Sequence, residues 1–209
     1  MKRAIALLGV LSVLALNARA NTLDYDADPG GGYQFYFGGG ANLRVLDDVN
    51  RTSVLGIKQI NIAFLNTNQS AVDVTLYVYD TGAGGVVGNL LYTSTITGVP
   101  NGASQLQFGA PGIATGIQNL WIGVSATANN AGMLLNPAGA PLIGTSADVF
   151  AWDRNGDGSI ANNEYFFFGG DPVANFAIEV LVPEPASMLA LGSGLAGLLA
   201  LRRRKARTA

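Results

Sequence analysis

The sequence predicts an all-β fold for residues 21–182, arranged as a β-sandwich of the jelly-roll type. Short segments rich in β-branched and aromatic residues follow one another, and turns rich in Gly, Asn, Asp and Pro separate them. No segment of this region carries an apolar stripe with the 3.6-residue period of an amphipathic helix. The region holds 162 residues, enough for one domain with a real hydrophobic core.

Alternation of apolar and polar residues places the individual strands. The clearest strand is 72–79, where Val72, Val74 and Leu76 fall on one face. The segment 53–64 alternates less regularly, which predicts a strand with both faces partly covered. An aromatic run between two glycine clusters predicts the first strand at 33–37. Further strands are predicted at 90–99, 105–108, 120–126, 133–135, 147–152, 165–168 and 175–182.

Three aspartates near the start of this region, Asp24, Asp26 and Asp28, allow two interpretations. They could form a second cation site, because carboxylate oxygens are ligands that divalent cations prefer. The favoured expectation is a solvated N-terminal arm, because carboxylates are seldom fully buried unless they are paired.

The first 20 residues have the three parts of a secretory signal peptide. Lys2 and Arg3 give a positive start, 4–16 is apolar, and 18–20 reads Ala-Arg-Ala, an A-x-A cleavage pattern. We expect cleavage after Ala20. The alternative is a retained membrane helix, which the short apolar stretch disfavours.

The C-terminal segment pairs an apolar stretch with a basic cluster. Residues 186–201 are 16 residues without a charge, and a helix over them would be about 24 Å long. A bilayer core usually requires about 20 apolar residues, but this stretch is too uniformly apolar for an ordinary surface helix. A basic flank stays cytoplasmic, so everything before residue 186 would lie outside. That flank consists of Arg202, Arg203, Arg204, Lys205 and Arg207.

The order Pro-Glu-Pro, apolar segment and basic cluster at a C-terminus resembles the PEP-CTERM sorting signal of bacterial envelope and secreted proteins. The resemblance covers 182–207, within a terminal segment 183–209. It implies that a membrane exosortase recognises Pro183, Glu184 and Pro185 and removes the tail, and that the five basic residues act as a retention signal. It further implies a transient inner-membrane anchor through 186–201, followed by a location at the outer surface or outside the cell. The alternative is a plain C-terminal membrane anchor.

Composition limits the classes of function. Residues 21–182 contain four basic and thirteen acidic residues, a net charge of −9, which would repel nucleic-acid phosphates and attract divalent cations. The chain has no Cys and therefore no disulfide. It has no His, which removes the Ser-His-Asp triad and the His-ligated zinc site. We therefore expect a protein that is not an enzyme and does not bind nucleic acid.

One motif carries recognisable chemistry. Residues 153–164 fit the 12-residue calcium loop D-x-[DN]-x-[DN]-G-x₅-E, in which oxygens at fixed positions point inward as the chain coils around the ion. The flanks read as strands rather than helices, so the loop resembles an isolated EF-hand-type loop between two strands. The alternative is a hairpin loop that binds no ion. The predicted ligands of a structural Ca2+ are Asp153, Asn155, Asp157, Ser159 and Glu164.

Other candidate sites are less defined. Five aromatic residues could stack on the apolar faces of sugars or could fill the core, and the core is favoured. They are Tyr33, Tyr36, Trp121, Trp152 and Tyr165. The carboxylates are too scattered in sequence to nominate a glycosidase pair. We expect an exported envelope or extracellular-matrix protein with a role in association with exopolysaccharide. The alternatives are a carboxylate-dependent polysaccharide hydrolase and a calcium-dependent adhesin.

Overall fold

The computed structural model describes residues 21–184. The predicted signal peptide, Pro185, the apolar stretch and the basic cluster lie outside the described residues. Within 21–184 no helix is long and apolar enough to cross a membrane. The strands of this part are β1 (Asn21–Asp26), β2 (Tyr36–Phe37), β3 (Val45–Asn50), β4 (Ile57–Asn66), β5 (Val72–Thr81), β6 (Val87–Val99), β7 (Gly102–Ile113), β8 (Asn119–Ala126), β9 (Ala131–Leu134), β10 (Phe150–Trp152), β11 (Tyr165–Phe166) and β12 (Ile178–Pro183).

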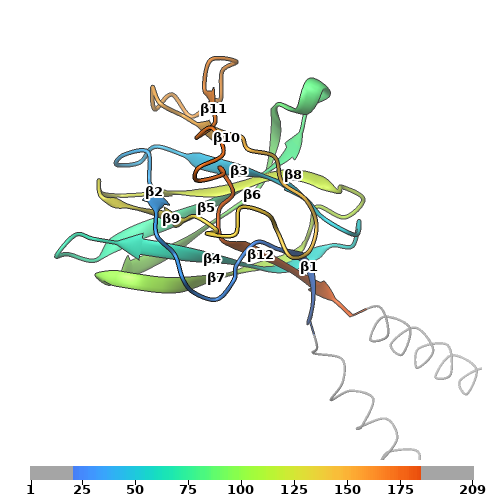
Figure 1. Ribbon diagram of the computed structural model, residues 1–209. Coiled ribbons are helices and arrows are strands. Elements are labelled where there is room, and N and C mark those ends of the chain that lie inside the picture. Colours follow the sequence, from blue (N-terminus) through green and yellow to red (C-terminus); the bar gives the residue numbers. More distant parts are fainter. Residues whose placement is uncertain (1–20, 185–209) are drawn as a thin grey trace, which may run out of the picture. The chain divides into compact units, whose positions relative to one another are not determined.

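The all-β prediction is confirmed, and the strands form two six-stranded sheets. The first sheet has the order β1-β12-β4-β9-β2, with β7 on the other side of β4. The second sheet has the order β11-β10-β3-β8-β5-β6. Figure 1 shows β4, β7 and β12 in one layer and β3 and β8 in the next, with β10 and β11 beyond them. The pairs that the register defines are antiparallel.

The core lies between the two sheets, because alternate residues of each strand point toward the other sheet. Ile60, Ile62 and Phe64 of β4 and Val74 and Val78 of β5 belong to one buried cluster, and all five are fully buried. Residues 23–182 form one compact unit. The clean alternation of β5 in the sequence is therefore its alternation between core and outer face.

The prediction of a solvated arm at 24–28 is wrong. Asp24 is 2% exposed, and its carboxylate lies 3.2 Å from the guanidinium of the buried Arg51. The hydroxyls of Thr52 and Ser53 also donate to Asp24. A buried carboxylate is tolerated when it is paired and hydrogen-bonded, and Arg51 meets both needs here. Asp24 and Asp26 therefore belong to strand β1 in the first sheet.

Strand β3 was not predicted, because two acidic residues stand at its centre. Asp48 points away from the core, whereas Asp47 lies among the core residues and is fully buried. One carboxylate oxygen of Asp47 accepts the backbone N–H of Phe176 at 2.9 Å, and the other has no partner among the described residues. Burial, together with the neighbouring Asp48, raises the pKa of Asp47 well above its ordinary value.

Candidate functional sites

The sorting motif begins inside the last strand of the domain. Pro183 is the final residue of β12, and Glu184 follows it at once. Ile178, Val180 and Val182 of the same strand point into the core, so the motif is joined to the packed domain without a spacer. Pro185 lies outside the described residues. Pro183 and Glu184, two of the three predicted recognition residues, therefore stand at the end of a strand that belongs to the core.

The predicted calcium loop connects two paired strands. β10 and β11 are antiparallel, and Ala151 lies opposite Tyr165 in their register. The loop between them begins at Asp153 and ends at Glu164, whose side chains are 1% and 4% exposed. The expectation that strands flank this loop is therefore confirmed.

The loop is held by its own side chains. Asp153 accepts the N–H of Gly158 at 3.0 Å, Asn155 accepts that of Asp157 at 2.8 Å, and Asp157 accepts that of Ser159 at 2.8 Å. Such side-chain-to-backbone bonds stabilise successive turns, and these turns give the loop its coiled shape. The spacing of the acidic and amide residues therefore shapes this loop locally.

A complete set of metal ligands is not assembled within residues 21–184, where no three acidic side chains are grouped closely enough to hold an ion. Both oxygens of Glu164 accept backbone N–H groups, from Arg154 at 3.0 Å and Ala161 at 2.9 Å. One oxygen of Asp153 is buried and has no partner among the described residues. The side chain of Arg44 donates to the carbonyl of Gly158, so a cation of the protein already contacts the loop. The donor types are those that calcium prefers, and the buried oxygen of Asp153 has no hydrogen-bond partner within residues 21–184.

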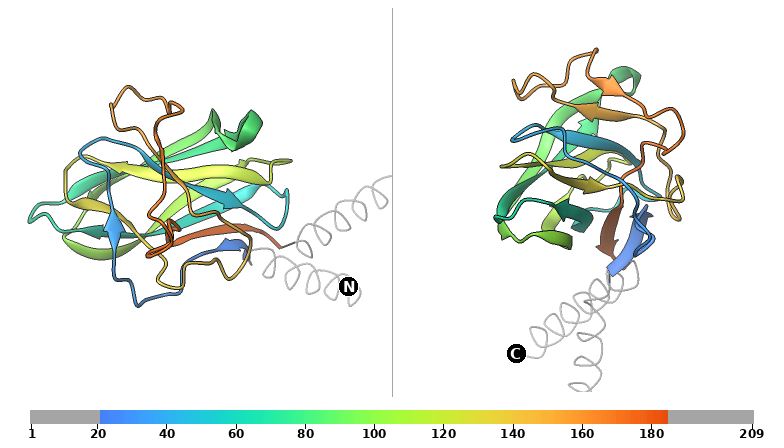
Figure 2. Two further views of the ribbon diagram at one scale, coloured as in Figure 1. Left: turned by 45° about the horizontal axis from the view of Figure 1, so that its top comes forward. Right: turned by 60° about the vertical axis from the view of Figure 1, so that its left-hand side comes forward.

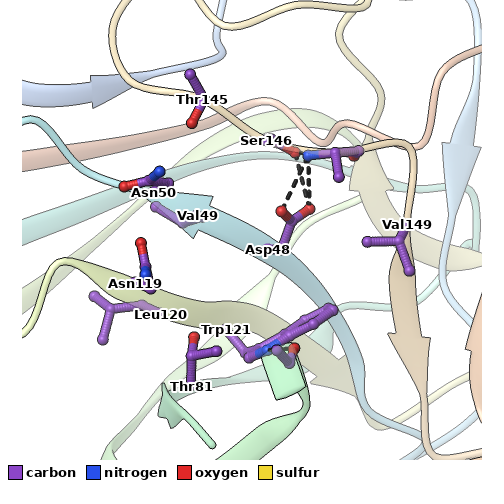
Figure 3. A pocket seen from close by; sticks show the side chains of 12 residues that line it. Asp48, Val49, Asn50, Thr81, Asn119, Leu120, Trp121, Thr145, Ser146 and Val149 are labelled. Carbon is purple, nitrogen blue, oxygen red and sulfur yellow. Dashed lines mark hydrogen bonds between the residues drawn. The ribbon is translucent and has the colours of Figure 1, made fainter. Parts of the chain in front are cut away.

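A cavity of about 480 Å³ lies beside β3 and β8, under the loop that contains Ser146 (Figure 3). Its one charged lining residue, Asp48, accepts the N–H of Ala147 at 3.0 Å and the hydroxyl of Ser146 at 3.1 Å. Trp121 forms part of the lining but is only 2% exposed, and its indole N–H donates to the carbonyl of Gly85 at 3.2 Å. The charged and aromatic groups of this cavity are therefore engaged in holding loops in place.

A second cavity of about 480 Å³ brings two carboxylates together on the first sheet. Asp28 accepts hydrogen bonds from the Tyr33 hydroxyl and from the side-chain amide of Gln105, the latter at 2.9 Å. Glu179 accepts the side-chain amide of Asn61 at 2.6 Å, and burial raises its pKa above the ordinary value. No local sequence pattern could predict that these two carboxylates line one cavity, because Asp28 and Glu179 stand at opposite ends of the domain sequence.

The five aromatic residues named above do not form one platform. Trp121 and Tyr165 pack edge to face, with ring centroids 5.5 Å apart. Tyr33 belongs to the cavity of Asp28 and Glu179. Tyr36 and Trp152 line a separate cavity. The sequence identified the aromatic residues but could not predict how the two sheets divide them.

Comparison with known proteins matches one segment of this chain. The family model described as the PEP-CTERM protein-sorting motif matches residues 181–205. No curated protein and no solved structure matches the chain. The predicted sorting motif is therefore confirmed, and this tail marks the chain for export and exosortase-dependent sorting, with transient association with the membrane beforehand.

Proposed function

We propose that this protein is a non-enzymatic component of the cell envelope or extracellular matrix that associates with exopolysaccharide. The observation that carries this proposal is the PEP-CTERM match at 181–205, which directs the β domain out of the cytoplasm. The domain charge of −9 and the absence of His and Cys favour a binding or structural role over catalysis. After sorting, the domain resides at the outer surface or in the medium.

We further propose that the two sheets form a β-sandwich of the jelly-roll type. Strands from both ends of the chain alternate in each sheet, in the orders β1-β12-β4-β7 and β3-β8-β5-β6. This strand order arises when a long antiparallel hairpin folds over so that its strands form two facing sheets. Such a scaffold leaves its loops and outer sheet faces free to bind ligands.

Mass spectrometry of the chain from the producing bacterium and from a strain without its exosortase tests the sorting step. We expect both termini to be trimmed in the parent strain, and the C-terminal tail to remain in the exosortase-deficient strain. Replacement of Pro183, Glu184 and Pro185 by Ala is expected to give the same untrimmed, membrane-bound product. An identical C-terminal mass in both strains would refute exosortase processing.

We also propose that residues 153–164 bind calcium as a structural ion. Asp153, Asn155, Asp157 and Glu164, with the carbonyl of Ser159, would hold it, and its charge would clamp the loop between β10 and β11. The partnerless oxygen of Asp153 supports this assignment. Binding requires Glu164 to exchange its backbone hydrogen bonds for the ion.

A thermal melt with and without calcium tests the ion. At a Ca2+ concentration about 100-fold above Kd the domain gains about 2.7 kcal/mol, which raises the melting temperature by roughly 5–10 °C for a domain of this size. Asp153→Asn and Asp157→Ala should each remove the increase. Asp73→Asn, outside the loop, is the matched control. An equal melting temperature in millimolar Ca2+ and in chelator would exclude the ion, and with it the calcium-dependent adhesin.

A second candidate function is polysaccharide hydrolysis, because Asp28 and Glu179 line one cavity. The raised pKa of Glu179 suits a general acid, and Asp28 is the second carboxylate at the same cavity. Release of reducing sugar from neutral polysaccharides by the parent chain, lost in Glu179→Gln, would favour this function. No release from any of them would leave the binding role.

A further inference from the structure

At one end of the sandwich an open cavity of about 630 Å³ is lined by residues of both sheets. Tyr36 and Phe37 of β2 come from the first sheet, and Trp152 comes from the end of β10 in the second. The volume falls within the range of about 300–1,000 Å³ that is usual for ligand sites.

The lining of this cavity has aromatic rings and amides but no charged side chain. Tyr36 is 36% exposed, and the amides of Asn129 and Asn130 stand nearby in the loop before β9. The side-chain amide of Asn130 makes no hydrogen bond to another residue within 21–184, and the N–H₂ of Asn129 is likewise available there, since only its oxygen accepts a bond, from Ala41. The cavity thus presents a ring face together with donors and acceptors that are not engaged.

The position of Trp152 is fixed by close packing. Its ring meets Phe37 at a centroid distance of 5.3 Å, at right angles, and Phe166 at 5.5 Å. A Cβ at Gly39 would lie 2.5 Å from the indole nitrogen, so only glycine allows this approach. That N–H is buried and has no acceptor among the described residues. The Trp152 ring is therefore held in place by its neighbours in the absence of a ligand, which lowers the entropy cost of binding on that side of the cavity.

We propose that this cavity, defined by Tyr36, Trp152, Asn129 and Asn130, binds a pyranose unit of a neutral polysaccharide. A pyranose ring has an apolar C–H face that stacks on an aromatic ring and hydroxyls at its rim that bond to amides. The lining has no charged side chain, and the nearby guanidinium of Arg154 lies 5.7 Å from the centroid of the Trp152 ring. The net charge of −9 on the domain disfavours an anionic sugar. This inference rests on the proposed association with exopolysaccharide and assigns it a place in the fold.

Binding of soluble neutral glucans and of alginate, a polyuronate, to the exported chain tests the proposal by calorimetry. Tyr36→Ala removes the exposed ring. Asn130→Gly removes one amide but keeps the left-handed backbone found there, whose φ is 59°. Phe35→Ala is the matched control, since Phe35 is a more exposed ring on the neighbouring residue and lines a different cavity. Equal melting temperatures show that the variants fold like the parent chain.

The parent chain should bind a neutral glucan and not alginate, and Tyr36→Ala and Asn130→Gly should each weaken binding about tenfold. Phe35→Ala should leave the affinity unchanged. Glucan binding that survives both cavity variants would overturn this site but not the association with polysaccharide. Binding to alginate alone would overturn the neutral ligand. Failure of the parent chain to bind any polysaccharide would overturn the association itself and this site with it.

Discussion

Asp47 should make the stability of the domain fall as pH rises. Its carboxyl group is fully buried between the sheets, one oxygen accepts the N–H of Phe176, and the other has no partner among the described residues. Because burial raises its pKa, the native state keeps this proton at a pH where the unfolded chain, with a pKa of about 3.9, has released it. The native state binds more protons in that window, so the free energy of unfolding decreases with pH.

The magnitude follows from a single proton. Between the unfolded pKa and the raised native pKa, each pH unit removes about 1.4 kcal/mol from the free energy of unfolding. In Asp47→Asn this contribution disappears, and the side-chain oxygen can still accept the N–H of Phe176. The free energy of unfolding of the variant, relative to that of the parent chain, should therefore increase by about 1.4 kcal/mol per pH unit above about pH 4.

Urea denaturation of the exported chain and of Asp47→Asn, at a series of pH values from 4 to 9, measures the difference. Asp48→Asn is the matched control. Burial also raises the pKa of Asp48, but hydrogen bonds from Ala147 and Ser146 oppose that shift. Its difference curve should therefore be flatter. Parallel stability curves for the parent chain and Asp47→Asn would show that Asp47 does not retain its proton in the fold.

Three further substitutions test the packing that supports the sites. Arg51→Met leaves Asp24 buried without its cation, and urea denaturation should show a loss of about 3–5 kcal/mol. Phe64→Ala empties the centre of the core, and its thermal melt should correspond to a loss of about 3–5 kcal/mol. Gly123→Ala places a Cβ 1.9 Å from the carbonyl oxygen of Val45, so β8 must move away from β3. Hydrogen exchange of the amides in β3 should then become faster; unchanged protection there would contradict the close approach.

Strands whose apolar and polar residues alternate regularly could be predicted from the sequence. The alternation at 72–79 corresponds to β5, because one of its faces lies on the core and the other does not. The predicted strand at 33–37 is reduced to Tyr36 and Phe37, since β2 pairs only with the short β9. Glycines around it supply turns rather than a longer ladder.

The strands that were missed owe their burial to distant partners. Asp24 makes β1 look polar in the sequence, and its burial depends on the ion pair with Arg51. Asp47 interrupts the apolar pattern of β3, and in the fold it accepts the N–H of Phe176. A single sequence does not show such pairings. The same limit applies to the sites, because the lining of each cavity comes from segments that only the sheet order brings together.

The sequence predicted where the acidic loop lies and that strands flank it. Residues 153–164 form one loop between two strands, and Asn155 and Asp157 make the turns that their residue types favour. Whether calcium binds there stays a prediction. Motif spacing specifies the residue types and the turns, whereas the orientation of Glu164 depends on which partner, ion or backbone, its carboxylate takes.

The pairing of β1 with β12 has a consequence for the timing of folding. These are the first and the last strands of the described chain, and they lie side by side in the sheet (Figure 2). Until β12 has formed, β1 has no partner strand apart from the bridge between Asp26 and Ile143, and residues 59–62 of β4 have one open side. Contacts of such long sequence separation form slowly, and an open strand edge invites aggregation and proteolysis. A polypeptide interrupted before residue 178 would therefore be unable to complete its first sheet.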